Sequence, residues 1–255
     1  MEFTYVIIFF ILGLFMGSFY TVVGSRLPKG EKIINDRSHC DNCQHELTLL
    51  DMIPVLSYLF LRGRCKYCKE EINPLSTSME LFTGTLFALS YFRFGFSYEL
   101  FIALGLVSML IILSVSDLSY YIIPDEVLIF FSGYFLIITT LQFGVVPALI
   151  SIRNGLILFG VMYLIMLIGN FLFKKESLGG GDIKLLFVFG LVIDPLLGLI
   201  SIFIASVIAL PIALILLKTK KQKLIPFGPF LLIAINFIYF TGITTKMILN
   251  FIELL

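Results

Sequence analysis

Charged residues are scarce in this chain of 255 residues: Asp, Glu, Lys and Arg together make up only 14%, whereas 59% of the residues are hydrophobic. Soluble proteins contain about 25% charged and about 45–50% apolar residues, and a domain of this size has too little interior to bury the excess. The composition therefore excludes an ordinary soluble enzyme, a disordered chain and a secreted disulfide scaffold, and predicts a polytopic membrane protein. The net charge of +1 provides no concentrated basic surface, so we expect no nucleic-acid partner.

Long apolar runs are abundant instead. Crossing a hydrocarbon core of roughly 30 Å takes about 20 apolar residues, and eight candidate runs lie at 5–24, 79–96, 99–116, 126–146, 150–173, 183–193, 196–217 and 224–241. The run at 183–193 is short and needs tilt, or residues beyond Asp194, to complete a span. A cleaved signal peptide is the alternative for the first run, but Glu2 precedes it and Arg26 follows it, the reverse of the usual charge pattern. We expect an all-α fold with about eight transmembrane helices.

Lys and Arg in short connections favour the cytoplasmic side of a membrane. With eight spans and an external N-terminus, 15 of the 18 basic residues fall on one face, and only Arg93, Arg153 and Lys246 fall on the other. We therefore predict a first transmembrane helix at 1–24, a cytoplasmic segment at 25–78 and a membrane-embedded part at 79–255.

All four cysteines lie in the predicted cytoplasmic segment as two Cys-x-x-Cys pairs, Cys40 with Cys43 and Cys65 with Cys68, separated by 21 residues. Two such turns complete a tetrahedral Zn²⁺ site, and four thiolates leave no open position, so the metal would be structural. A disulfide would require an oxidising compartment, which the charge pattern argues against; free thiols without metal are the remaining alternative. His39 and His45 flank the first pair, and we expect them to be solvated rather than substitute ligands.

Carboxylates at the ends of membrane spans are costly, and are candidates for function. Four qualify: Glu80, Asp117, Asp125 and Asp182. Asp125 follows Pro124, and Asp182 follows three glycines at 179–181, so each is interpreted most simply as the N-cap of the next helix. Asp117 ends the run 99–116, where the helix dipole disfavours an anion.

Asp117 and Asp182 fall on the same, cytoplasmic, face of the predicted arrangement and could meet across helix ends. Two carboxylates in one partly dehydrated site share a proton, so that one acts as a base and the other as an acid toward a water that attacks an amide carbonyl. This is the chemistry of aspartic peptidases. A structural or ion-relay use of the same residues stays open on these grounds.

Seven stretches occur in the order found in the bacterial type IV prepilin peptidases, and together they make the chain resemble that family over nearly its whole length. They lie at 17–28, the two cysteine pairs, 51–58 with 61–65, 80–84, 117–125, 179–182 and 226–230. The resemblance implies an aspartic peptidase domain at 79–255 with Asp117 and Asp182 as the catalytic pair. It also implies a bacterial inner-membrane enzyme that removes the leader of prepilins or pseudopilins at the cytoplasmic face, after a glycine preceding the mature hydrophobic helix.

Many members of the family also methylate the new N-terminal residue with S-adenosylmethionine. The family commonly has Asn where this chain has Thr21, and Leu where it has Tyr20. If that position serves methyl transfer, the resemblance implies a peptidase without the second activity.

Two other classes of function compete with this interpretation. A transporter or channel could use Asp117 and Asp182 as an ion relay, with the cysteine segment as a zinc-binding regulatory loop. Such a protein predicts carboxylates near the middle of the membrane and broken helices repeated in two halves, and neither is evident in the sequence. A membrane scaffold with a partner-binding zinc loop leaves Asp117 unexplained.

Overall fold

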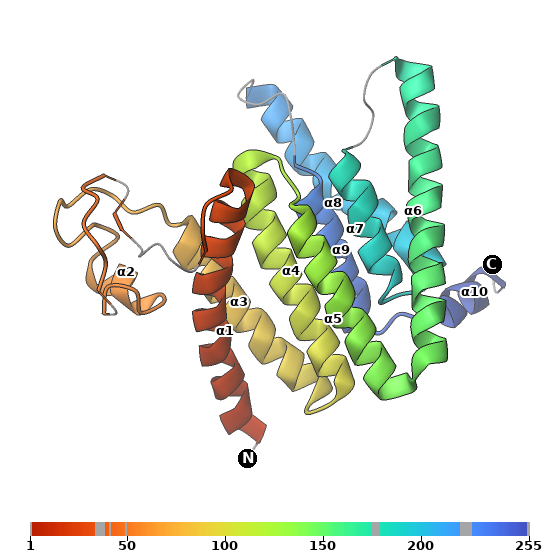
Figure 1. Ribbon diagram of the computed structural model, residues 1–255, viewed down its shortest axis with the longest axis horizontal. Helices are drawn as coiled ribbons and strands as arrows, with labels where there is room; N and C mark the ends of the chain where they lie inside the picture. Colours follow the sequence, from red (N-terminus) through yellow and green to blue (C-terminus); the bar gives the residue numbers. More distant parts are fainter. Residues whose placement is uncertain are drawn as a thin grey trace. The chain divides into compact units, whose positions relative to one another are not determined.

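The computed structural model describes residues 2–33, 39–40, 42–48, 50–174, 179–219 and 226–253. Within these ranges the chain is mainly helical (Figure 1), apart from a segment before α3 (Leu75–Phe94) that holds turns, the short α2 (Leu56–Phe60) and two isolated β-bridges. It divides into two compact units, Met1–Leu100 and Phe101–Leu255. The first unit holds α1 (Glu2–Arg26), α2 and α3. The second holds most of α4 (Tyr98–Tyr120), followed by α5 (Asp125–Phe143), α6 (Val145–Phe173), α7 (Gly180–Gly190), α8 (Pro195–Thr219), α9 (Gly228–Thr241) and α10 (Thr245–Glu253).

In the first unit, α1 packs closely along α3. A Cβ atom on Gly13 would lie 2.7 Å from the Cα of Gly84, and one on Gly17 would lie 2.8 Å from the Cα of Glu80. Small residues four apart let two helix backbones approach closely, which is how helices associate in a membrane without a hydrophobic driving force between them. The pair Gly13 and Gly17 therefore sets the contact between α1 and α3.

In the second unit, α4, α7 and α9 form the core. The most apolar part of α4 is 78% buried, compared with 17–28% for α5, α6 and α8. The amide of Asn236 in α9 donates to the Leu106 carbonyl in α4 at 3.4 Å. The outer helices expose large apolar side chains such as Phe130, Leu164 and Phe203, as helices that face lipid do.

Each of the eight predicted apolar runs forms a helix, so the prediction of an all-α protein is confirmed for the described residues. In that part of the chain, five helices are long and apolar enough to cross a membrane: α1, α4, α5, α6 and α8. At 1.5 Å per residue, α7 and α9 are only ~16 and ~21 Å long, short of a ~30 Å core. The number of eight spans therefore stays a prediction.

Five of the basic residues that support the predicted orientation lie outside the described residues: Arg37, Lys175, Lys220, Lys221 and Lys223.

Candidate functional site

Asp117 lies in the last turn of α4 and is 6% exposed. The helix ends because Tyr121 adopts a positive φ of 58°, with its N–H donating to the Asp117 carbonyl at 2.9 Å. The buried Ser116 hydroxyl then donates to the Ile122 carbonyl at 2.5 Å, which fixes the short linker before Pro124 and α5. The prediction that Asp117 occupies the C-terminal end of a helix is confirmed.

The carboxylate of Asp117 meets the N-terminus of another helix. Its Oδ2 accepts the backbone N–H of Gly228, the first residue of α9, at 3.1 Å. A Cβ atom on Gly228 would lie 2.8 Å from that oxygen and 3.2 Å from the Cδ1 of Ile123. The positive end of the α9 dipole therefore faces an anion that the end of α4 disfavours.

Asp182 lies in the first turn of α7, which begins at Gly180 after the N-cap Gly179. No side-chain cap hydrogen bond is made there, so the interpretation of Asp182 as an N-cap is wrong. The residue precedes the apolar part of α7 and lies outside the five long apolar helices. Burial, together with the negative charge of Asp117, raises the pKa of Asp182 to about 7. The two carboxylates are thus close enough for the charge of one to influence the titration of the other.

Ile123 joins the segments that carry the two aspartates. A Cβ atom on Gly181 would lie 2.9 Å from the Cβ of Ile123, and one on Gly228 would lie 3.2 Å from its Cδ1. The linker after Asp117 therefore packs between the beginning of α7 and the beginning of α9. Only glycine at these two positions lets the three segments approach so closely. The arrangement brings two carboxylates and two helix N-termini together, which suits a shared proton and a polarised water.

Asp125 is the first helical residue of α5, after the N-cap Pro124, and makes no side-chain cap hydrogen bond. The interpretation of Asp125 as an N-cap is therefore wrong. Its two carboxylate oxygens both accept from Nζ of Lys184 in α7, at 2.8 Å each. From the sequence, Lys184 supports only the predicted orientation in the membrane. A lone lysine at the start of the apolar run 183–193 was the signal that could have identified it as a candidate.

Glu80, the remaining candidate carboxylate, belongs to the first unit. It is buried in α3, and its Oε2 accepts the backbone N–H of Val55 at 2.8 Å. Val55 has a φ of 61°, a conformation that is costly for a β-branched residue. Glu80 therefore holds the turn before α2 in place, which is a structural role.

The four cysteine sulfurs converge in the first unit. The Sγ atoms of Cys40, Cys43, Cys65 and Cys68 all lie within 4.8 Å of one another, and those of Cys40 and Cys68 are 3.8 Å apart. A Zn–S bond of about 2.3 Å gives a tetrahedron with S–S edges of about 3.8 Å. The cluster therefore fits a zinc ion with little contraction. Among the described residues, neither His39 nor His45 belongs to it.

The two Cys-x-x-Cys turns repeat one backbone geometry. In each, the N–H of the first cysteine donates to the carbonyl five residues later, and the residue after the second cysteine has a positive φ and donates back. The residues are Cys40 with His45 and Gln44 (3.0 and 2.8 Å, φ 57°), and Cys65 with Glu70 and Lys69 (2.8 and 3.0 Å, φ 63°). The backbone N–H groups of Cys68 and Tyr67 lower the pKa of Cys65 to about 7. This favours the thiolate form that a metal binds.

Thr21, where the resemblance suggested a departure bearing on methyl transfer, is buried in α1. Its hydroxyl donates to the carbonyl of Ser18 in the same helix at 2.8 Å. The hydroxyl hydrogen is thus used within α1 and is not available to S-adenosylmethionine. The Thr21 oxygen can still accept a hydrogen bond, so this position offers that cofactor an acceptor and no donor.

Comparison with known proteins gives two family matches, one in each compact unit. Residues 11–94 match the Bacterial Peptidase A24 N-terminal domain, and residues 104–214 match the Type IV leader peptidase family. No solved structure matches the chain.

Several curated proteins are similar over most of their length, and each is named prepilin leader peptidase/N-methyltransferase. The protein of Bacillus subtilis (strain 168) is 35% identical, with 87% of this chain and 88% of that protein covered. The protein of Vibrio cholerae is 30% identical, with 94% and 98% covered, and that of Stutzerimonas stutzeri is 30% identical, with 88% and 86% covered.

Proposed function

Because the chain belongs to the type IV prepilin leader peptidase family, we propose that it is an aspartic endopeptidase with Asp117 and Asp182 as its catalytic pair. Its substrates are prepilins or pseudopilins, cut between the leader and the mature apolar helix. The observation that carries the proposal is geometric: Ile123, in the linker after Asp117, contacts Gly181 next to Asp182 and also Gly228, whose N–H donates to Asp117. Burial and the charge of Asp117 also raise the pKa of Asp182 to about 7. A carboxyl group that keeps its proton near neutral pH beside a second carboxylate is what general acid and base catalysis by an aspartate pair requires.

The hydrogen bond from Gly228 to Asp117 supports a division of roles between the two aspartates. A hydrogen bond donated by a backbone N–H group favours the ionised form of a carboxylate. On this ground we propose that Asp117 serves as the base and Asp182 as the acid of a pair that shares one proton and titrates as a unit. Asp117 takes a proton from the attacking water, whose oxygen bonds to the carbonyl carbon, while Asp182 transfers its proton to the carbonyl oxygen. As the C–N bond breaks, Asp117 passes its proton to the leaving amine, and the hydroxyl that becomes the new carbonyl returns its proton to Asp182.

We propose that all eight apolar helices span the membrane, with the N-terminus outside and the aspartate pair at the cytoplasmic face. In this arrangement α4 must end, and α5, α7 and α9 must begin, on the same side. The contacts of Ile123 with Gly181 and Gly228 agree with that requirement. The short helices α7 and α9 both begin at the site, where a thinner hydrophobic layer would let water and the leader reach the carboxylates.

Cys40, Cys43, Cys65 and Cys68 would hold a structural Zn²⁺ ion. A closed four-thiolate site supplies folding free energy to its segment and no open position for a reactant. The ion therefore has no part in the hydrolysis itself.

Methyl transfer to the new N-terminus is a second candidate function, favoured by the names of the relatives. S-adenosylmethionine would supply the methyl group. The hydroxyl of Thr21 donates within its own helix, so we derive no step that passes through this cofactor.

The proposal is tested by cleavage of a model prepilin in detergent by the wild type, Asp117→Asn and Asp182→Asn. Each substitution is expected to lower kcat by at least about 10³-fold, as loss of one member of a catalytic unit does. Asp194→Asn is the matched control, since Asp194 lies between α7 and α8 and accepts a hydrogen bond from the Thr245 hydroxyl at 3.0 Å. This variant should cleave the prepilin at the wild-type rate. Full activity in either Asp117→Asn or Asp182→Asn would refute the assignment.

A further inference from the structure

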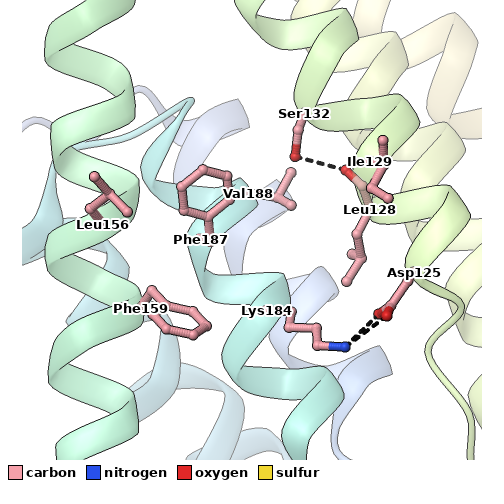
Figure 2. Close-up of a pocket in the computed structure, with 9 residues that line it drawn as sticks. All are labelled: Asp125, Leu128, Ile129, Ser132, Leu156, Phe159, Lys184, Phe187 and Val188. Carbon is pink, nitrogen blue, oxygen red and sulfur yellow. Dashed lines mark hydrogen bonds and ion pairs between the residues drawn. The ribbon is translucent and has the colours of Figure 1, made fainter.

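A groove lies between α5 and α6, with α7 forming its floor (Figure 2). Its volume is about 460 Å³, within the range of small-molecule sites. The lining is apolar apart from Ser132 and one ion pair; its members are Asp125, Leu128, Ile129, Ser132, Leu156, Phe159, Lys184, Phe187 and Val188. Since the hydroxyl of Ser132 donates to the Leu128 carbonyl at 2.7 Å, it offers no free hydrogen to an occupant.

The shape of the groove follows from two close contacts. The helices α5 and α6 are joined at Gly144, whose φ is 88°, and they separate toward their other ends (Figure 1). The helices α6 and α7 are pressed together, because a Cβ atom on Gly190 would lie 2.5 Å from the Cα of Gly155. Since α6 and α7 are held against each other while α5 diverges, a wedge remains in which Phe187 and Val188 of α7 point between α5 and α6 (Figure 2).

The polar end of the groove is the Asp125–Lys184 ion pair. The side chains of Lys184 and Asp125 are 51% and 56% exposed. A salt bridge this accessible to solvent contributes only about 0–1 kcal/mol, because both groups are well solvated when apart. Replacing Lys184 by another cation as the partner of Asp125 therefore requires little free energy.

This polar end lies near the same end of α7 as Asp182, although side chains two positions apart on a helix point to different faces. Lys184 lies two residues after Asp182 on α7, and Asp125 lies two residues after Ile123. Ile123 in turn contacts Gly181, at the start of α7. The apolar part of the groove runs from this point along α5 and α6, whose flanks expose Ile129 and Leu156.

We propose that this groove binds the apolar helix that follows the leader of the substrate, and that Asp125 exchanges Lys184 for a basic side chain of the leader. The inference rests on the proposed function and names the substrate subsite. A membrane protein whose N-terminal flank stays in the cytoplasm carries Lys and Arg in that flank. The charge of Asp125 and the apolar lining beside it match these two parts of such a substrate in their order along the chain.

Photo-crosslinking tests the groove directly. A benzophenone amino acid is placed at Ile129 or Leu156, and at the controls Ile137 and Leu164, which are exposed on the same helices outside the lining. The Asp182→Asn background keeps a model prepilin uncut in liposomes. Positions 129 and 156 are expected to form adducts with the apolar helix of the prepilin at least about 10-fold more often than the controls. Equal adducts at all four positions, or adducts with lipid alone, would overturn the proposal.

Kinetics test the exchange of charges. Asp125→Asn should raise KM about 2–5-fold for a prepilin with a basic leader, as loss of one exposed ion pair does, leave kcat unchanged, and have no effect on a prepilin whose leader Lys and Arg are replaced by Gln. Lys184→Gln should lower KM, because it frees Asp125. A merely structural clamp predicts the same loss from both variants whichever leader is used, and that result would refute the exchange.

The catalytic pair and the substrate groove are refuted by different results. If Asp117→Asn or Asp182→Asn still cleaves, the proposed function is lost. If both are inactive while positions 129 and 156 give no selective adducts, only the groove assignment is lost.

Discussion

The backbone N–H of Gly228 donates to the carboxylate of Asp117 at 3.1 Å, across 111 positions of sequence. The hydrogen bond joins the last turn of α4 to the first residue of α9. It compensates an anion at a helix C-terminus with the N-terminal dipole of another helix. It also requires a residue without a side chain, since a Cβ atom on Gly228 would lie 2.8 Å from the carboxylate.

Gly228→Ala is therefore expected to lower kcat/KM for prepilin cleavage by about 10–100-fold, because the methyl group displaces either Asp117 or Ile123. Cleavage kinetics in detergent measure the effect, and the helical circular dichroism should be unchanged. The matched control is Gly160→Ala in α6, where an added Cβ meets nothing within 4 Å. A fully active Gly228→Ala enzyme would show that the contact with Asp117 is not needed for catalysis.

Cleavage is expected to fall as the pH rises through about 7. The raised pKa of Asp182 keeps this carboxyl protonated below that value, and deprotonation removes the general acid. A profile of kcat/KM between pH 5 and pH 9 checks the prediction, and the Asp194→Asn control should follow the wild-type curve. An activity that rises steadily up to pH 9 would contradict a protonated Asp182 in the active form.

Because its pKa is raised in the folded state, ionised Asp182 lowers the free energy of unfolding at neutral and alkaline pH. Its pKa rises from 3.8 to about 7 on folding, so the folded state binds more protons between these values, and stability falls as the pH rises through this window. The cost is absent below about 3.8 and complete above about 7, where it amounts to at most ~4 kcal/mol at 1.36 kcal/mol per pKa unit. Asp182→Asn should therefore raise Tm at pH 8, and the gain should shrink toward pH 5.

Thermal melts followed by circular dichroism suit this measurement, since the chain has no tryptophan. A gain in Tm that stays constant from pH 5 to pH 8 would show that the proton of Asp182 does not underlie it.

The cysteine cluster is expected to hold about one zinc ion per chain after purification, and Cys65→Ser or Cys68→Ser should lower this to near zero. Four thiolates are needed to close the tetrahedral site. Elemental analysis provides the measurement. His45→Ala is the control and should retain the metal, because the cluster consists of cysteines and the His45 ring lies against Tyr67, with 3.6 Å between ring centroids. Zinc retained by both serine variants would exclude the proposed ligand set.

The close contact of α6 and α7 provides a prediction for stability. Gly190→Ala places a Cβ atom 2.5 Å from the Cα of Gly155, where neither backbone has room to move without separating the helices. Overpacking of this kind costs about 1–3 kcal/mol, so Tm should fall by several degrees. Gly133→Ala in α5, with nothing within 4 Å of the added Cβ, should leave Tm unchanged or raise it. Equal Tm values for the two variants would contradict the contact.

Most of the helices were predictable from the sequence, because a membrane span depends on local composition and length. The end of α4 after Asp117 followed from Pro124, which disfavours continuation of a helix. The two N-cap interpretations were wrong because α5 begins at Asp125 and α7 begins at Gly180, so each carboxylate lies within the first turn, among neighbours that are distant in sequence. Asp125 binds Lys184 in α7, and Asp182 lies close to the charge of Asp117.

The amino-acid sequence alone determined the membrane class, the helical runs, the two cysteine pairs and the candidate aspartates, since each depends on residues that are neighbours or follow a fixed spacing. Only the tertiary structure decided that the N–H of Gly228 faces Asp117, that Lys184 pairs with Asp125, and that a groove remains between α5 and α6. These features depend on which helix faces pack together, and on glycines at which a missing Cβ permits contact. Neither property is visible in any single stretch of an apolar sequence.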